Sequence, residues 1–414
     1  MALYDNGRPS ILLIAGDVSG DIHTARLARM VLEQHPDWKL HALGGPHLRK
    51  TIADVPGCYF LNDTSHCSAI GLISASKIYL RCRALGKQAL EFLRTHPVDA
   101  AVLCDWGGFN GRMLRHLREM GIPVLYYFPP RSWQRTGLPG LGIAQLVTRV
   151  ATPFRWSANR LLAAGCRAEW VGHPLLENIR PKEQRRALRA EFGVAKNEQL
   201  IALLPGSRRS EIRVLAPTLA KTAAQLKARR PLRFAAVVPE QLKNEARQFL
   251  PEWIPIWTDR AADLLLACDA AIVKTGTATL EAALAGAPQV TIYSGSMIQG
   301  LEWVLLWAWK RIPFIAMPNI VLQRKAVPEL IGLNCTPDKI ECAILPLLEN
   351  SVARRQMLRD YSEVRRALGS DLPVSATTRT AQILEEMLVE MNGESPVHAS
   401  TLDNKCNKLP VEIN

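Results

Sequence analysis

Two segments that follow apolar runs combine glycine with hydroxyl and charged side chains: residues 204–211 read LPGSRRSE, and residues 274–281 read KTGTATLE. Glycine lets the backbone approach a ligand, and amides at a helix start attract anions, so both segments suit phosphate. The first adds guanidinium groups, which favour a diphosphate, with a solvated basic loop as the alternative. The second places Glu281 one turn further in, where it could bind a ribose diol. The candidate residues are Gly206, Ser207, Arg208, Glu211, Thr275, Gly276, Thr277 and Glu281.

A third glycine turn, residues 15–21, reads AGDVSGD and lies between an expected strand and an expected helix. It lacks the G-x-G-x-x-G and Gly-Lys-Ser/Thr patterns of nucleotide-binding turns. Its two aspartates would repel a phosphate, so the turn favours a hydroxyl-rich ligand. The alternative is a tight turn with Asp21 in the first turn of the helix. The candidates here are Gly16, Ser19, Gly20 and Asp21.

Asp105 follows the apolar run 100–104, at the carboxyl end of an expected strand, and Asn110 lies five residues further on. A carboxylate at this position could act as a general base for a hydroxyl nucleophile, or it could cap a helix. His173 lies in a Gly-His-Pro sequence and is a further candidate, although a lone histidine is more often structural. The sequence has no H-E-x-x-H, no G-x-S-x-G and no clustered His/Cys pattern, which argues against metal hydrolases and α/β-hydrolases.

The elements that position these residues alternate along the chain. The expected strands are residues 11–15, 39–43, 100–104, 123–127, 199–204, 233–238, 270–273 and 289–293. The expected helices are residues 21–34, 76–95, 110–120, 218–228, 262–268 and 277–284. Such alternation predicts α/β halves with parallel strands and right-handed crossovers, and the pattern restarts near residue 200. We therefore expect two Rossmann-like domains with a cleft between them, where ligands bind at the carboxyl ends of the strands.

The 414 residues divide into two domains of ordinary size. We expect an N-terminal domain over residues 1–178 and a C-terminal domain over 198–365, joined by a polar link. A long final helix, about 353–391, is interrupted near residues 369–373, and its part 366–391 is expected to pack back on the N-terminal domain. Residues 392–414 are polar and aperiodic, which predicts a disordered tail.

Composition and charge narrow the function classes. Hydrophobic residues make up 48% and charged residues 21%, which excludes a mostly disordered chain. The net charge of +13 indicates an anionic partner, such as a phosphorylated substrate or an anionic lipid. Nucleic acid also fits the charge, but no nucleic-acid-binding module is recognisable. Nine scattered cysteines without a C-x-x-C pair, and an N-terminus without a signal-peptide pattern, favour a cytoplasmic protein with reduced thiols.

Residues 297–317 raise the question of membrane contact. This apolar segment is interrupted by Glu302 and by a Lys-Arg pair, so it is a poor spanning helix. Tryptophans flanked by basic residues are typical of interfacial helices, and a buried core helix is the alternative. The candidate membrane-contact residues are Trp303, Trp307, Trp309, Lys310 and Arg311.

Seven motifs in one order resemble the lipid A disaccharide synthases, glycosyltransferases of the GT-B fold. The resemblance extends from about Ile11 to Leu384. Its motifs are AGDVSGD, Ala69-Ile70-Gly71, Asp105 with Phe109-Asn110, Gly172-His173-Pro174-Leu175, LLPGSRRSEI, TGTATLE and MPNIVLQRKAVPEL. The acceptor half departs from the family pattern at Gly108, where the family has a second aspartate, and at Ser74, where it has a glutamate. Ser294 replaces a family arginine, and the donor half is otherwise better kept.

The resemblance implies an inverting transfer from UDP-2,3-diacylglucosamine to 2,3-diacylglucosamine 1-phosphate (lipid X), which gives a β-1,6 disaccharide and UDP. Asp105 would be the base, Arg208 with the Gly206–Ser207 backbone would hold the diphosphate, and Glu281 would hold the ribose. Asn319 and Arg324 would be further donor-site or dimer-contact residues. The resemblance implies no metal or cofactor, a peripheral location on the inner face of the cytoplasmic membrane, and a homodimer. A UDP-sugar epimerase of the same fold and a non-catalytic lipid-binding homologue are the alternatives.

Overall fold

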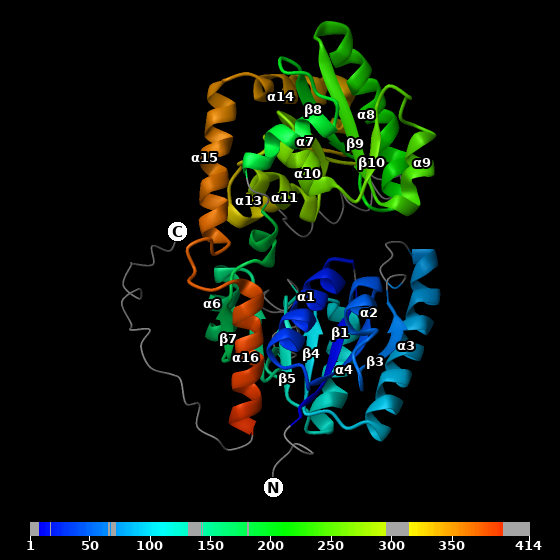
Figure 1. Cartoon of the computed structure of the whole chain (residues 1–414), viewed down its shortest axis with the longest axis vertical. Coiled ribbons are helices and arrows are strands. Elements are labelled where there is room, and N and C mark those ends of the chain that lie inside the picture. Colours follow the sequence, from blue (N-terminus) through cyan, green and yellow to red (C-terminus); the bar gives the residue numbers. More distant parts are fainter. Residues whose placement is uncertain are drawn as a thin grey trace. The chain divides into compact units, whose positions relative to one another are not determined.

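The computed structural model describes residues 8–16, 18–64, 67, 72–130, 142, 144–179, 182–294 and 314–391. The chain forms two compact units, each a parallel sheet flanked by helices (Figure 1). The first unit comprises Met1–Thr152, Trp156–Val171 and Ala376–Asn414, and the second comprises Pro153–Arg155 and Gly172–Ser375. Among the described residues, no helix has the length and apolar character that crossing a bilayer requires.

In the described part of the first unit, seven strands form one sheet in the order β3-β2-β1-β4-β5-β6-β7. Every neighbouring pair is parallel, and the interior strand β1 aligns Ile11 with Leu40 on one side and with Ala100 on the other. The strands are β1 Ser10–Ala15, β2 Lys39–Gly44, β3 Tyr59–Asp63, β4 Ala100–Cys104, β5 Val124–Tyr127, β6 Arg149–Thr152 and β7 Ala168–Trp170. The helices are α1 Val18–Gln34, α2 Pro46–Ile52, α3 Leu72–Thr95, α4 Gly107–Glu119, α6 Arg155–Ala163 and α16 Ala376–Met391.

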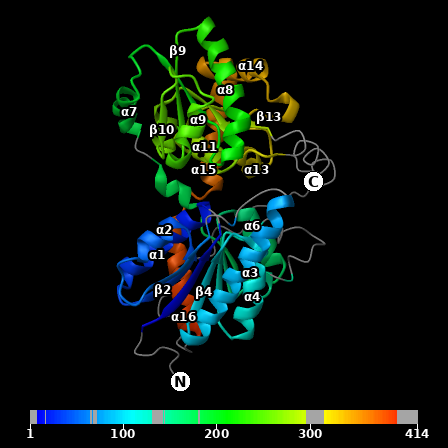
Figure 2. The same ribbon diagram turned by 90° about the vertical axis from the view of Figure 1, so that its right-hand side faces the viewer.

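Helices cover both faces of this sheet, and each face has its own hydrophobic core. Helices α3 and α4 pack on one face, while α1, α2 and α16 pack on the other (Figure 2). The end of the chain thus returns to the first unit, where Glu385 of α16 pairs with His35 at 2.9 Å and Glu390 pairs with Arg149 at 2.7 Å. The helix expected over 353–391 is interrupted, as the sequence predicts near 369–373: it forms one helix over Val352–Ala367 and a second, α16, and only the second belongs to this unit.

The described part of the second unit contains a six-stranded sheet in the order β10-β9-β8-β11-β12-β13, again parallel throughout. The strands are β8 Gln199–Leu204, β9 Leu232–Val238, β10 Ile256–Thr258, β11 Ala270–Lys274, β12 Gln289–Tyr293 and β13 Glu329–Ile331. The main helices are α7 Arg185–Glu191, α8 Arg209–Arg229, α9 Lys243–Arg247, α10 Ala261–Ala267, α11 Thr277–Ala285, α13 Met317–Leu322, α14 Pro337–Leu348 and α15 Val352–Ala367. This unit includes Gly172–Ser375, so the change from the first unit to the second lies before Gly172, whereas the sequence predicts a boundary at 178.

Both sheets reverse their strand order at one point, which confirms the predicted α/β class. Strand β1 lies between β2 and β4, and β8 lies between β9 and β11. Connections on the two sides of such a point diverge, so they leave a crevice at the carboxyl ends of the strands. In the first unit this point lies beside Gly16 and Asp105, and in the second beside the segments 204–211 and 274–281.

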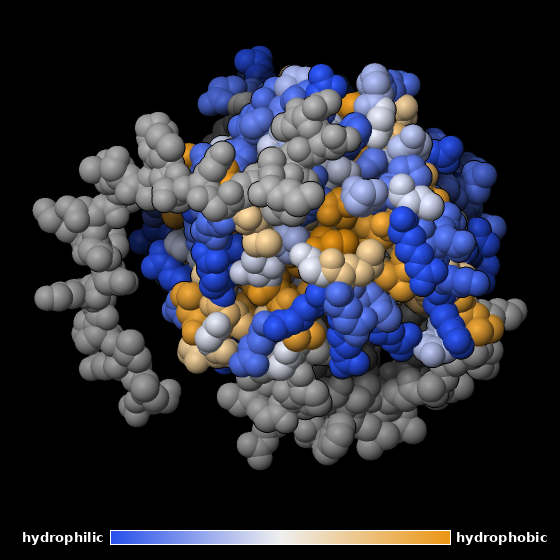
Figure 3. Space-filling model, turned by 90° about the horizontal axis from the view of Figure 1, so that it is seen from below, coloured by the Kyte–Doolittle hydropathy of each residue, from blue (hydrophilic) through white to orange (hydrophobic). Residues whose placement is uncertain are grey.

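The surface is mixed rather than uniformly polar. On the face shown in Figure 3, hydrophobic residues gather in patches between hydrophilic ones. The exposed large hydrophobic residues include Tyr79 and Leu80 on α3, which are 48% and 63% exposed. Single exposed apolar residues are ordinary on a folded protein, so only their combination with a groove or a charge pattern is informative.

Candidate active site

Asp105 has a strained backbone at the end of β4. Its φ is +46°, and so is that of Trp106, in the left-handed region that costs non-glycine residues free energy. The Asp105 amide donates to the carbonyl of Tyr127 at 3.1 Å, while the Tyr126 hydroxyl donates to the Asp105 carbonyl. The buried Asn110 side chain donates to the same carbonyl at 2.9 Å and to that of Cys104 at 3.2 Å. Strain that several contacts maintain together is typical of functional sites, so this geometry favours Asp105 as a site residue.

The Tyr126 hydroxyl is suited to hold this carbonyl. Tyr126 is fully buried, and burial raises the pKa of its phenol well above the ordinary value. The phenol therefore stays protonated and can donate at every physiological pH. Asn110, expected on the acceptor side, acts in this structure through the Asp105 backbone rather than by an exposed side chain.

Gly16 lies close to the Asp105 segment because Trp106 covers it. A Cβ atom at Gly16 would lie 2.0 Å from atoms of the Trp106 ring, so only glycine fits here. The Trp106 ring also stacks on Phe109 of α4, with ring centroids 4.0 Å apart. The glycine turn and Asp105, 89 residues apart in the sequence, are thereby brought together at the strand reversal. Ser19 and Gly20 lie in the first turn of α1, and Asp17 is outside the described residues.

The structure gives Asp21 a structural role. Its carboxylate is buried and accepts hydrogen bonds from the amides of Gly45 at 2.8 Å, His47 at 2.9 Å and Leu48 at 3.1 Å. These amides open α2, a helix that the sequence analysis does not predict. A negative charge at a helix start is stabilising, so Asp21 holds α2 against the turn.

His23 is a residue of this region that sequence reasoning missed. It is buried in α1 and stacks on Phe128, with ring centroids 4.7 Å apart and an interplanar angle of 5°. Phe128 follows β5 with a φ of +58°. Burial, together with the nearby charge of Arg26, lowers the pKa of His23 to about 3. A neutral imidazole therefore lies beside the glycine turn, and no feature of the sequence around 128 signals its partner.

His173 belongs to the second unit. It is buried, and its Nδ1 accepts a hydrogen bond from the amide of Leu175 at 3.2 Å. Its own amide donates to the carbonyl of Leu368 at 2.8 Å. His173 thus caps the short 3-10 helix η3, Pro174–Asn178. This is a structural role, which is the more frequent one for a lone histidine.

The turn after β8 is organised by Glu211. Gly206 has a φ of +125°, and Ser207 and Arg208 are exposed. The Glu211 carboxylate accepts from the amides of Ser207 at 3.0 Å and Arg208 at 3.3 Å, and it pairs with Lys274 at 2.7 Å. A carboxylate of the chain itself therefore occupies the amides that the sequence analysis assigns to a diphosphate. The Lys274 pair joins this turn to the segment 274–281, so the two predicted segments meet.

The turn after β11 leaves its helix start exposed. Gly276 has a φ of +139°, and Thr277, the first residue of α11, is exposed. Thr275 donates through its hydroxyl to the carbonyl of Ile315 at 2.8 Å, which fixes the turn from outside. The first amides of a helix have no acceptor within the helix, so the start of α11 can bind an anion. In the turn after β8, by contrast, the Glu211 carboxylate already accepts from the amides.

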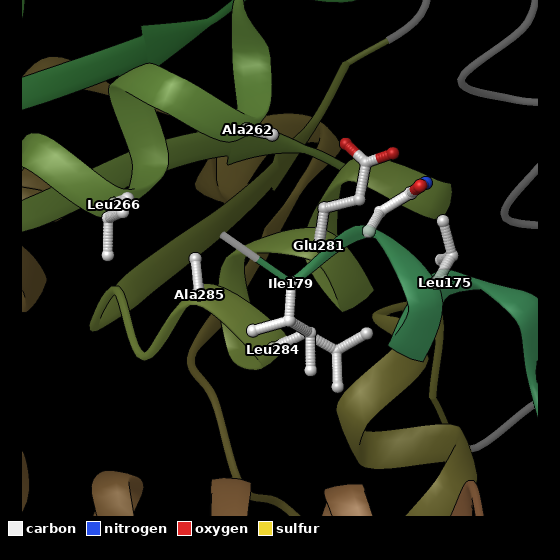
Figure 4. Close-up of a pocket in the computed structure, with 8 residues that line it drawn as sticks. Leu175, Ile179, Ala262, Leu266, Glu281, Leu284 and Ala285 are labelled. Atoms are coloured by element: carbon white, nitrogen blue, oxygen red, sulfur yellow. The ribbon is translucent and has the colours of Figure 1, made fainter. Parts of the chain in front are cut away.

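A pocket adjoins α11 on the side of Glu281. Figure 4 shows Glu281, Leu284 and Ala285 on α11 beside Leu175 and Ile179. Asn178 adds one amide, and the remaining apolar wall comes from α10. The lining residues are Leu175, Asn178, Ile179, Ala262, Leu266, Glu281, Leu284 and Ala285. The pocket has a volume of only about 50 Å³, so it offers an apolar surface beside one carboxylate and one amide rather than a cavity that encloses a ligand.

Asn319 and Arg324 are held within the second unit. Asn319 is fully buried, and its side chain makes four hydrogen bonds, to the carbonyl of Val327, to Glu329 and from the amides of Ala326 and Val327. Arg324 pairs with Asp360 at 2.9 Å and with Glu363 at 2.7 Å. In this structure both residues therefore position the chain, and neither presents its side chain freely.

The expected membrane-contact residues Trp303, Trp307, Trp309, Lys310 and Arg311 lie outside the described residues. Within the described ranges, no group of three or more His, Cys, Asp or Glu side chains is arranged to hold a metal ion.

Solved structures resemble this chain in fold. A MnaA structure with UDP from S. aureus aligns with a TM-score of 0.62 at 14% identity, covering 94% of this chain and 99% of the other. MurG of Acinetobacter baumannii aligns with a TM-score of 0.55 at 15% identity, covering 91% and 99%. The neighbours include glycosyltransferases of the GT-B fold, and at these identities the likeness concerns the fold alone.

Relatives by sequence identify the family. Residues 11–384 match the family described as lipid-A-disaccharide synthetase. The lipid-A-disaccharide synthase of Geobacter sulfurreducens is 32% identical over 393 residues, covering 93% of this chain and 99% of the relative. That of Myxococcus xanthus is 31% identical over 386 residues, covering 92% and 98%. The chain therefore belongs to the lipid-A-disaccharide synthase family and is a glycosyltransferase of lipid A synthesis with the GT-B fold.

Proposed function

We propose that this enzyme transfers 2,3-diacylglucosamine from its UDP derivative to the 6-hydroxyl of 2,3-diacylglucosamine 1-phosphate, with inversion. The products are the β-1,6 tetraacyl disaccharide 1-phosphate and UDP. The observation that carries the proposal is the strained backbone of Asp105 at the strand reversal, held by the Tyr126 hydroxyl and the Asn110 amide. A reactive carboxylate needs such a fixed position, because proton transfer depends on geometry.

The donor is assigned to the second unit. The exposed start of α11 at Thr277 would hold the diphosphate, together with the exposed Arg208 guanidinium. Glu281 would accept hydrogen bonds from the ribose hydroxyls, with the base against the apolar pocket between α10 and α11. The S. aureus MnaA structure, a protein of the same fold, was determined with UDP, which supports a nucleoside diphosphate as a ligand of this fold.

Glu211 changes the role that we assign to the turn between β8 and α8 in binding the donor. Because its carboxylate already accepts from the amides of Ser207 and Arg208, these amides are not the proposed phosphate ligands. Glu211 instead fixes the turn, and the turn aims the Arg208 side chain. Gly206 is required by this arrangement, since a Cβ atom there would lie 2.4 Å from the Glu211 carboxylate.

In the proposed step, Asp105 takes the proton of the acceptor hydroxyl as its oxygen attacks the anomeric carbon. The bond from that carbon to the diphosphate oxygen breaks on the opposite face, and the electron pair leaves with UDP. Arg208 and the positive end of α11 stabilise the charge that develops on UDP, so the proposed step uses no metal or cofactor.

Both substrates carry acyl chains, and the chain has a net charge of +13. We therefore propose peripheral binding to the inner face of the cytoplasmic membrane, with the tryptophan-rich segment 303–311 as one contact. A homodimer through the C-terminal half is proposed from the family resemblance.

The test is UDP release from the purified enzyme, given the UDP-diacylglucosamine with and without lipid X in detergent. Release that depends on lipid X, with a disaccharide product, is expected. Release without lipid X, or epimerisation of a UDP-sugar, would contradict the proposed transfer, and failure to bind UDP would favour a non-catalytic lipid-binding protein.

Two variants separate the roles of the units. Asp105→Ala is expected to abolish turnover while UDP still binds, because the donor is assigned to the second unit. Arg208→Ala is expected to weaken UDP binding about tenfold or more, since a charged hydrogen bond contributes about 1.5–3 kcal/mol. Turnover by the first variant would remove Asp105 from the mechanism, and unchanged UDP affinity of the second would remove Arg208 from the donor site.

A further inference from the structure

A groove lies between α3 and α4 on the first unit. Its floor is apolar and is formed by Gly86 and Leu90 of α3 and by Phe109 and Met113 of α4. Phe109 and Met113 are buried beneath it, and the groove has a volume of about 310 Å³. Phe109 also stacks on Trp106, the neighbour of Asp105, so the floor is continuous with the packing of the candidate active site.

Gly86 opens this groove at a cost to the helix. It lies inside the 24-residue helix α3, where glycine is less favourable than alanine. Close packing does not require it: a Cβ atom there would meet Phe109 at 3.7 Å and Met113 at 3.9 Å, which is ordinary van der Waals contact. Glycine at this position thus keeps open a space that any larger side chain would fill.

Basic side chains surround the floor. Arg83, Lys87 and Arg94 of α3 and Arg112 of α4 line the groove and are exposed, against one carboxylate, Glu91. In the part of the chain that the structure describes, none of these four cations forms an ion pair. The pKa of the Cys82 thiol, also in the groove, is raised by burial, and Arg112 and Arg81 oppose that shift.

His116 and Tyr79 complete the surroundings. His116 lines the groove and lies 3.3 Å from Glu119, and the Arg112 guanidinium stacks over the exposed Tyr79 ring at 4.9 Å. The groove therefore combines an apolar floor with an excess of positive charge at its rim.

We propose that this groove binds an anionic membrane phospholipid, with part of an acyl chain on the apolar floor and the phosphate among the cations. Charge complementarity selects an anionic partner, and the apolar floor selects one with a hydrocarbon chain. A nucleic acid or a free phosphate would use the cations but leave the floor uncovered. The inference goes beyond the proposed reaction and holds independently of its donor and acceptor.

The first experiment follows Cys82. The full-length protein is treated with N-ethylmaleimide, and the labelling of each cysteine peptide is measured by mass spectrometry. Dioctanoyl phosphatidylglycerol, below its micelle-forming concentration, is expected to slow labelling of Cys82 at least fivefold. Exposed Cys342 in the second unit is the internal reference, and its rate should not change. Equal slowing by dioctanoyl phosphatidylcholine, equal slowing by inorganic phosphate, or slowing of Cys342 as well would overturn the proposal.

The second experiment compares matched variants by calorimetric titration with the same lipid. Arg83→Gln/Lys87→Gln removes two rim cations, and Arg29→Gln/Arg115→Gln removes two exposed cations that do not line the groove. Affinity is expected to fall at least tenfold in the first pair and less than twofold in the second. Equal losses would show a general charge effect and contradict a defined site.

Filling the groove tests the floor. Gly86→Leu is expected to lower lipid affinity at least tenfold with the charges unchanged, and Gly86→Ala should lower it less. Because alanine suits a helix better than glycine, Gly86→Ala should also raise the melting temperature, which checks that the fold is retained. Wild-type affinity in a folded Gly86→Leu protein would refute the proposed occupancy.

Discussion

Replacing Tyr126 with phenylalanine removes one hydroxyl from the support of Asp105. The hydroxyl donates to the Asp105 carbonyl inside the first unit, where Tyr126 is fully buried. The carbonyl keeps its second donor, the Asn110 amide at 2.9 Å, so no buried acceptor is left without a partner. The expected cost is that of one buried hydrogen bond, about 1 kcal/mol.

Loss of this hydrogen bond is expected to lower both the melting temperature and the turnover rate, and the two effects can be calculated separately. About 1 kcal/mol lowers the melting temperature of a unit of ~200 residues by about 2–4 °C. The same hydrogen bond holds Asp105 in a backbone conformation that costs about 1–3 kcal/mol. Its loss therefore shifts the population away from that conformation, and turnover should fall about fivefold, since 1.4 kcal/mol corresponds to a factor of ten. UDP affinity should not change, because the donor is assigned to the other unit.

Tyr361→Phe is the matched control. Tyr361 is buried in the second unit, and its hydroxyl donates to the Ala287 carbonyl at 3.2 Å and accepts from Gln289 at 3.2 Å. It should lower the melting temperature by a similar amount and leave turnover at the assay temperature near that of the wild type. If Tyr126→Phe loses stability but keeps full turnover, the strained backbone does not serve catalysis and the argument is refuted.

Three further predictions concern the second unit and the histidines of the first. Asn319→Ala removes four hydrogen bonds of a buried side chain, so the free energy of unfolding of the second unit should fall by about 3 kcal/mol or more in thermal unfolding. The UDP affinity of the folded variant should stay unchanged. Glu211→Gln should weaken UDP binding about tenfold by titration, because a neutral amide accepts more weakly from the Ser207 and Arg208 amides and so loosens the turn that aims the arginine. Burial lowers the pKa of His23 to about 3 and that of His41 to about 4, so folding keeps both neutral and the unfolded chain takes up protons first as the pH falls below 6.5. The free energy of unfolding should therefore fall from about pH 6.5 toward pH 4, by about 1.4 kcal/mol per pH unit for each histidine, and a pH series of melting temperatures should be flatter for His41→Gln.

The central strands could be predicted because they are continuous apolar runs. Residues 11–15 and 199–204 correspond to β1 and β8, which lie between two neighbours and are buried on both faces. The edge strands β10 and β13 have three residues each and are only half-buried, so they carry no such run. Tertiary pairing, rather than local pattern, makes these segments strands.

The glycine turns of the site were visible in the sequence, but the side-chain contacts within them were not. Asp21 finds its partners 24 to 27 residues away, at the start of a helix that has no strong apolar period. Glu211 turns back on the amides of its own segment, which a motif cannot distinguish from a free carboxylate. The positive φ of Asp105 depends on Tyr126, 21 residues further along, and no local residue pattern encodes it.

The return of α16 to the first unit has a consequence for how the protein is made. The ribosome releases residues 1–171 long before residues 376–391, so the face of the first sheet that α16 covers stays open while the whole second unit is synthesised. The side chains that close it, among them Ala381, Leu384 and Met387, are fully buried in the finished protein. The second unit, by contrast, has all its strands and helices once Ser375 has emerged. In the order of synthesis the second unit is therefore completed before the first, and the nascent first unit depends on α16 to bury its core.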